Sequence, residues 1–161
     1  MKNPKYSKGM TLVEVMIVVA IVAILVMVVY PSYTEQIRKT RRSDAKIALA
    51  DLAQRQENYF ADNNQYANLL TDPTTNSLIK IATDGGVKYG FKRDGNDLIS
   101  KDRDYKLTVS TNTGRTQFTL TATAIDTGKQ KDDTKCKIMT FDHTSKKEAE
   151  DAAGNPSTYC W

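Results

Sequence analysis

The chain has 161 residues and a formal net charge of +4 at pH 7, from 23 lysines and arginines against 19 aspartates and glutamates. This length predicts a single domain. Three of the basic residues, Lys2, Lys5 and Lys8, precede Gly9, so the rest of the chain holds 20 basic and 19 acidic residues. Because that part is nearly neutral, net charge gives no support to a general nucleic-acid-binding protein.

An apolar run from Met10 to Tyr30 follows the lysines and contains a single charge, Glu14. Its 21 residues would form a helix of about 31 Å, which matches the hydrocarbon core of a bilayer. A cleaved secretory signal has a shorter apolar region and a small-residue cleavage site, and Val29-Tyr30-Pro31 provides none. A plain membrane anchor explains the length but not Glu14, because a carboxylate within a bilayer costs about 2.5–3.5 kcal/mol. We therefore expect a retained, specially processed helix.

A second helical pattern follows Pro31. Apolar residues recur at helical spacing from Ser32 to about Ala61, with charged residues between them, which predicts an amphipathic helix that buries one face. Proline removes one backbone hydrogen bond and bends a helix without necessarily ending it. The sequence therefore predicts one helix of about fifty residues, with an apolar half, a kink near Pro31 and an amphipathic half.

Four basic side chains lie close together in the amphipathic half: Arg38, Lys39, Arg41 and Arg42. Such a group could bind DNA or anionic lipid headgroups. In a helix, however, these positions point to several faces, and Glu35 and Asp44 dilute their charge. We expect a solvated or subunit-pairing surface here, with nucleic acid as the alternative partner.

After the helix, short alternating runs are separated by turn-forming residues. The turn signals are Asn63-Asn64, Asp72-Pro73, Asp84-Gly85-Gly86 and Asp94-Gly95-Asn96, and the candidate strands are Val87–Lys92, Tyr105–Thr111, Thr116–Ala124 and Cys136–Asp142. Asn112-Thr113-Gly114 predicts a hairpin, and we expect a loop over Thr144–Thr158. A long helix followed by an antiparallel sheet of three to four strands predicts an α+β fold, with the helix across one sheet face.

The two cysteines of the chain are Cys136 and Cys160. An even number of cysteines in a domain that follows a membrane segment favours a disulfide and an oxidising compartment. Two buried thiols or a metal pair are the alternatives. With one histidine in the chain, His143, and no closely spaced ligands, a metal site is not favoured.

No phosphate-binding glycine loop, nucleophile motif or acid–base pair is found in the sequence, so we expect neither an enzyme nor a cofactor. Asp94-Gly95-Asn96-Asp97 has some residues of a calcium loop but lacks the full ligand spacing, and it predicts a plain turn. For His143 we expect an exposed position at a strand end.

The start of the chain resembles a known processing motif. Lys8-Gly9-Met10-Thr11-Leu12-Val13-Glu14 is similar to the prepilin peptidase signature of type IV pilins and pseudopilins, with a basic leader, a glycine before the cut and a glutamate at the fifth mature position. Met10 departs from the phenylalanine of most members. Further similarity to PilE-type minor pilins lies in Pro31, Arg41-Arg42-Ser43-Asp44-Ala45, Leu52-Ala53-Gln54-Arg55-Gln56-Glu57, Tyr66 and the ending Cys160-Trp161, and it is looser after Tyr66.

This resemblance implies roles for three residues. Prepilin peptidase would cleave between Gly9 and Met10, and the new amine of Met10 would be methylated. Glu14 would pair with the N-terminal amine of a neighbouring subunit in the filament. Two physical arguments support that role for Glu14: a carboxylate in the first turn is favoured by the helix dipole, and a charge in an apolar filament core needs a partner.

The resemblance also implies an organisation. Residues 1–9 would be the leader, 10–31 the membrane and filament-core half of the helix, and 32–161 the globular pilin domain. Before assembly the protein would be a single-pass inner-membrane protein with its C-terminal part in the periplasm, in contact with the pilus assembly machinery. Afterwards it would be extracellular, packed against other pilins through its N-terminal helix.

The implied function is that of a minor pilin, a structural subunit supporting pilus biogenesis, twitching motility, adhesion or DNA uptake. A type II secretion pseudopilin and a major pilin are the alternatives on the same scaffold. A DNA-uptake receptor pilin is a further alternative. The cysteine pair favours a pilin over a major pseudopilin, which usually lacks it.

Overall fold

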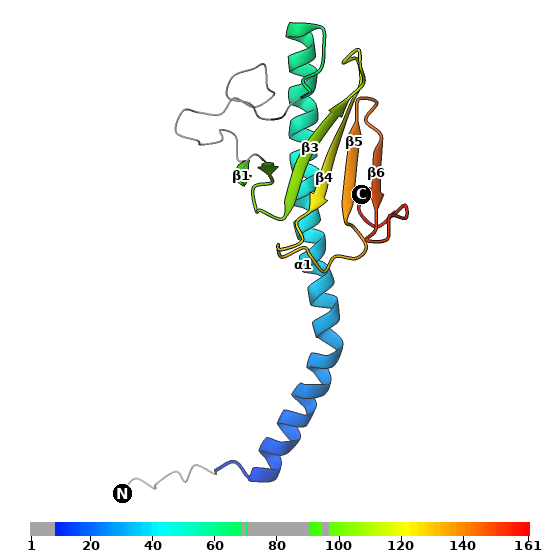
Figure 1. Ribbon diagram of the computed structural model, residues 1–161. Helices are drawn as coiled ribbons and strands as arrows, with labels where there is room; N and C mark the ends of the chain where they lie inside the picture. The colour runs from blue at the N-terminus through cyan, green and yellow to red at the C-terminus, as the bar shows by residue number, and fades with distance from the viewer. Residues whose placement is uncertain (1–8, 69, 71–90, 95–96) are drawn as a thin grey trace, which may run out of the picture. The chain divides into compact units, whose positions relative to one another are not determined.

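The computed structural model describes residues 9–68, 70, 91–94 and 97–161. The chain divides into two compact units, one up to Ile37 and one from Arg38 onward. A single helix, α1 (Leu12–Asn63), has 52 residues and supplies most of the first unit and part of the second (Figure 1). The predicted long helix is therefore confirmed.

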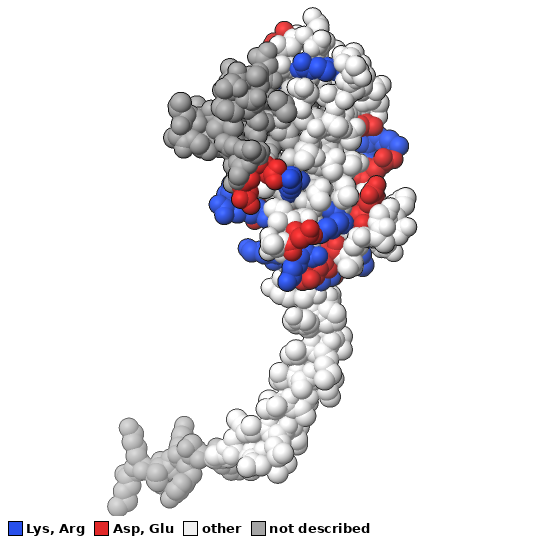
Figure 2. All heavy atoms as spheres, viewed as in Figure 1, with Lys and Arg blue, Asp and Glu red and all other residues white. Residues whose placement is uncertain are grey.

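The first unit presents its apolar side chains to the surroundings. Every large apolar residue between Met10 and Tyr30 is 46–77% exposed, and Figure 2 shows this part of the helix as an almost uncharged surface. The helix is long and apolar enough to cross a membrane. Burial against other parts of the chain does not explain these side chains, so they need an apolar environment from elsewhere.

Pro31 lies inside α1. Proline has no N–H to donate to the carbonyl one turn earlier, which leaves that carbonyl without its helical partner. The hydroxyl of Thr34 donates to the Pro31 carbonyl over 2.9 Å, a local bond of the kind that accompanies helix bending. The kink itself stays a prediction.

The second unit contains an antiparallel sheet. Its strands are β1 (Lys92–Asp94), β2 (Asp97–Ile99), β3 (Tyr105–Thr111), β4 (Phe118–Ala124), β5 (Ile138–Asp142) and β6 (Lys147–Glu150). Each strand pairs with the next along the chain, in the order β1-β2-β3-β4-β5-β6 (Figure 1). The α+β fold is thus confirmed, but the described residues form six strands rather than the three or four expected.

Two differences account for the extra strands. β6 lies within Thr144–Thr158, where we expected a loop; it is a charged edge strand whose single apolar residue, Ala149, is buried opposite Met139. Edge strands are often short and charged, which hides them from apolar patterning. At the other edge, β1 and β2 flank the expected turn at Asp94-Gly95-Asn96. They pair with each other, with Asp94 opposite Asp97. Several expected features lie outside the described residues: the turns Asp72-Pro73 and Asp84-Gly85-Gly86, most of the strand Val87–Lys92, and Gly95-Asn96.

The predicted hairpin is confirmed between β3 and β4, which pair from Tyr105 opposite Ala124 to Thr111 opposite Phe118. Its turn is held by Asn112, whose side-chain oxygen accepts the backbone N–H groups of Thr116 and Gln117 at 2.8 and 3.2 Å. Asparagine is favoured in turns for this reason.

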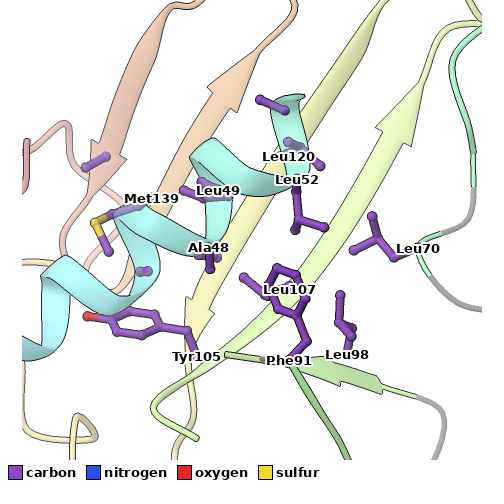
Figure 3. Close-up of a cluster of buried hydrophobic side chains, with 14 of the residues drawn as sticks. Ala48, Leu49, Leu52, Leu70, Phe91, Leu98, Tyr105, Leu107, Leu120 and Met139 are labelled. Carbon is purple, nitrogen blue, oxygen red and sulfur yellow. The ribbon is translucent and has the colours of Figure 1, made fainter. Parts of the chain in front are cut away.

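Within the second unit, one face of α1 packs across the sheet (Figure 3). Its apolar stripe consists of Ala45, Ala48, Leu49, Leu52 and Ala53, and the sheet contributes mainly Leu98, Tyr105, Leu107, Phe118, Leu120, Ala122 and Met139. In Figure 3, Leu49 and Leu52 point from the helix toward side chains of the sheet. Because alternate residues of β4 are buried from Phe118 to Ala124, one sheet face and one helix face close the core between them.

Candidate functional site

The first turn of α1 is closed by a reciprocal pair of side chains, Thr11 and Glu14. The Glu14 N–H donates to the Thr11 hydroxyl at 3.3 Å, and Glu14 Oε2 accepts the Thr11 N–H at 3.3 Å. This is a capping box, with threonine before the first helical residue and glutamate three residues later. The spacing of Thr11 and Glu14 in the sequence predicts this cap, although we expected only an assembly role for Glu14.

The capping box gives Glu14 a local role, in addition to the pairing with a neighbouring subunit that the resemblance implies. Its carboxylate satisfies one of the free N–H groups at the helix start, where negative charge is also favoured by the helix dipole. The side chain remains exposed, so a cation can still reach it. Helix capping and ion pairing with another subunit are therefore compatible uses of the same carboxylate.

Gly9 and Met10 precede the helix and are both exposed. A Cβ atom added at Gly9 would have no atom of the described chain within 4 Å. The fold of the chain therefore does not require glycine at this position. A requirement for glycine here would have to come from a protein that acts on this peptide.

Arg42 is not part of a solvated surface, contrary to our expectation. Its Nε and Nη2 atoms each lie 2.7 Å from a carboxylate oxygen of Asp133, and the two side chains are 2% and 1% exposed. A forked arginine–carboxylate pair of this kind is strongly directional. It fixes the connection between β4 and β5 to α1. The partner lies 91 residues away in sequence, so the local pattern gave no sign of it.

Arg41 extends this attachment. Its Nη1 atom donates to the carbonyl of Lys129 at 2.7 Å, and its Nε lies 3.9 Å from Asp104 Oδ2. Burial raises the pKa of Asp104, an effect that the nearby Arg41 guanidinium opposes. Figure 2 shows positive and negative side chains intermingled at this end of the second unit rather than a face of one sign.

Gln130 completes the buried polar network. Its Nε2 atom lies within hydrogen-bonding distance of Asp133 Oδ2 (2.9 Å), the Tyr105 hydroxyl (3.1 Å) and the Arg38 carbonyl (3.1 Å). Burial raises the pKa of Tyr105 to about 12, so the phenol stays protonated. Such a network specifies one arrangement of loop and helix.

A second attachment lies at the other end of the helix. The buried Gln56 amide bonds both backbone groups of Ala67, donating at 2.8 Å and accepting at 2.9 Å. Arg115 lies in the turn between β3 and β4. Its backbone carbonyl accepts the N–H of Tyr66, and its Nε donates to the Tyr66 carbonyl, both at 2.8 Å. The residues that follow α1 are therefore held against the β3–β4 hairpin, which gives Gln56 and Tyr66 a structural role.

The two cysteines form a disulfide with a Cα–Cα distance of 5.7 Å, and both are fully buried. The predicted pairing of Cys136 and Cys160 is confirmed. The bond closes a loop across a sequence separation of 24 and fixes Trp161, whose indole N–H donates to the Glu148 carbonyl at 2.8 Å.

His143 is half-buried beside Phe118, with ring centroids 6.4 Å apart, rather than exposed as expected. Its backbone N–H bonds the Phe118 carbonyl, which holds it against β4. Among the described residues, no group of three or more histidine, cysteine, aspartate or glutamate side chains could hold a metal ion.

Comparison with known proteins gives matches in both units. Residues 31–140 match the family described as "Type IV minor pilin ComP, DNA uptake sequence receptor", and residues 4–30 match the "Prokaryotic N-terminal methylation motif". The type IV major pilin protein PilA of Myxococcus xanthus is 31% identical over 90 residues, which are 56% of this chain and 38% of that relative. The chain thus spans well under half of that relative's length.

A solved type IV pilin from Shewanella oneidensis is 21% identical, with a TM-score of 0.44 over 77% of this chain and 97% of that chain. The family match covers the amphipathic half of α1 and the sheet as far as β5, and the methylation motif covers the apolar half. Pilin families are structural, and their members assemble with one another in filaments. Because the family match over residues 31–140 spans more than half of the chain, the chain belongs to the family of type IV minor pilins.

Proposed function

We propose that this pilin subunit serves DNA uptake as a receptor displayed on a type IV pilus. The observation that carries the proposal is the family match over residues 31–140, to a family described as a DNA uptake sequence receptor. The same match favours a minor pilin over a secretion pseudopilin. The face in Figure 2 carries basic and acidic side chains intermingled, so for this face we propose no broad basic surface and instead propose a restricted DNA contact.

The proposal includes processing at the start of the chain. Prepilin peptidase cleaves between Gly9 and Met10, and the new Met10 amine is methylated. The methylation motif over residues 4–30 supports this step, as does the exposed junction, where nothing in the fold calls for glycine. The leader removed holds Lys2, Lys5 and Lys8, so the processed subunit is close to neutral.

Assembly then uses Glu14. Before assembly the helix lies in the inner membrane and the second unit lies in the periplasm, where the Cys136–Cys160 bond is stable. In the filament, Glu14 pairs with the Met10 amine of a neighbouring pilin. The capping box is compatible with this pairing, because Glu14 stays exposed while it caps the helix start.

The test compares DNA uptake with pilus formation. A strain lacking this protein should form filaments but take up DNA poorly, and the wild-type gene should restore uptake. In parallel, the full-length protein in detergent should bind duplex DNA by fluorescence anisotropy, with an affinity that falls as salt rises. Normal uptake in the deletion strain, together with no DNA binding by the purified protein, would refute the receptor role.

A further inference from the structure

A hollow of about 450 Å³ lies between the helix and the far edge of the sheet in the second unit, lined by Lys46, Ile47, Ala50, Phe141, Lys147 and Trp161. We name these six residues the Trp161 patch. Lys46 and Ile47 come from α1, Phe141 from the end of β5 and Lys147 from the start of β6. The patch therefore joins α1 to the β5–β6 hairpin and the C-terminal residue, which are distant from α1 in sequence.

The indole of Trp161 is held in place from two sides. Its neighbour Cys160 is in the buried disulfide, and its N–H bonds the Glu148 carbonyl. An aromatic ring fixed in this way loses little conformational entropy when a ligand packs against it. Beside it, Ile47 is 70% exposed although it is a large apolar residue.

Two ammonium groups lie over this aromatic ring. Lys46 Nζ is 6.0 Å and Lys147 Nζ 5.4 Å from the centroid of Trp161, and Lys147 Nζ is also 6.0 Å from that of Phe141. Neither lysine forms an ion pair with a carboxylate in the described part of the chain, and the nearby Glu148 pairs with Lys146. The cations are thus held by π-systems, and their charge is not neutralised.

We propose that the Trp161 patch binds a DNA strand, with phosphates on Lys46 and Lys147 and the apolar face of a sugar or base on Ile47 and Trp161. Proteins that bind single-stranded nucleic acid combine cationic side chains for the phosphates with aromatic rings for the bases. A protein partner fits less well, because lysine is depleted from protein–protein interfaces. The proposal rests on the proposed receptor function and locates a contact for it.

The experiment measures binding of full-length protein in detergent to single-stranded and to duplex DNA, by fluorescence anisotropy over a salt series. In K46Q/K147Q, affinity should fall about tenfold for every sequence, and the slope of log K against log salt should become shallower by about two. The control K92Q/K101Q removes the same charge from exposed lysines of β1 and of the β2–β3 turn and should leave binding near wild type.

A second variant, Ile47→Ser, tests the apolar part of the patch. Because Ile47 is exposed, the fold should be unaffected, and matching thermal unfolding of all variants checks this. Affinity should fall about fivefold with an unchanged salt slope. A larger loss on single strands than on duplex indicates contact with a base face, whereas equal losses indicate contact with a sugar; both support the patch.

The outcomes distinguish failure of the receptor function from failure of the Trp161 patch alone. If wild-type protein binds neither form of DNA, the receptor function fails and the patch fails with it. If wild type binds DNA but K46Q/K147Q binds equally well, or loses no more than K92Q/K101Q, only the patch is refuted. Normal DNA binding with reduced entry of K46Q/K147Q into filaments would make the patch a pilin interface and would also overturn the proposal.

Discussion

The two units of this pilin are stabilised in opposite ways. In the first, the large apolar side chains are exposed, and the contacts of Glu14 lie within three residues. In the second, α1 is buried against a six-stranded sheet, and Arg42 finds its partner 91 residues away. The first unit therefore depends on an external apolar environment, whereas the second is held by its own long-range contacts. Mutations should separate these two kinds of dependence.

The largest loss of stability should come from Arg42→Ala. This change leaves the Asp133 carboxylate buried without its forked partner, which typically costs about 3–5 kcal/mol. Urea unfolding of the full chain in detergent, followed by a signal from the sheet, measures it. A double variant, Arg42→Met with Asp133→Leu, should recover most of the loss. A single variant as stable as wild type would show that the pair does not anchor the loop.

Removing the disulfide should have an effect nearly as large. Replacing Cys136 and Cys160 with serine releases a loop of about 24 residues, which costs roughly 3–4 kcal/mol in the chain-entropy model. Thermal unfolding of oxidised and variant protein gives the comparison. An unchanged transition would mean that the C-terminal segment is held by its other contacts alone.

In the first unit, Glu14→Ala should act on assembly rather than on stability. The cleaved protein should remain in the membrane but enter filaments at about a tenth of the wild-type level or less, since the neighbouring amine loses its partner. The second unit should unfold as in wild type. Thr11→Ala, which removes the other half of the cap and costs about 1 kcal/mol, is the matched control and should assemble better than Glu14→Ala. Immunoblots of sheared filaments and membranes measure both variants.

The smallest effect concerns pH. Burial raises the pKa of Asp104 above its ordinary value, so the folded state holds this proton more tightly than the unfolded state does. The resulting stabilisation is complete below the ordinary aspartate pKa and is lost as pH rises through the raised one. Asp104→Asn should flatten the dependence of unfolding free energy on pH in that range. The same slope in wild type and variant would contradict this assignment.

The contrast between the units also explains what the sequence could predict. The long helix, the β3–β4 hairpin and the disulfide follow from local periodicity, turn residues and cysteine count. β6 was missed because a charged edge strand needs only one buried residue, Ala149. The Arg42–Asp133 pair was missed because burial of a charge depends on a distant partner. The capping box of Thr11 and Glu14 could be predicted from the spacing of the two residues. We assigned Glu14 to assembly because its surroundings are apolar.

The most direct test of the central claim, a processed minor pilin that joins filaments through its first unit, is quantitative mass spectrometry of sheared filaments. The account predicts a small amount of this protein beside a more abundant pilin, with a methylated Met10 as its first residue. It also predicts near absence of the Glu14→Ala variant from the same fraction. Filaments that contain peptides spanning Gly9 and Met10, or that contain wild-type and Glu14→Ala protein equally, would contradict it.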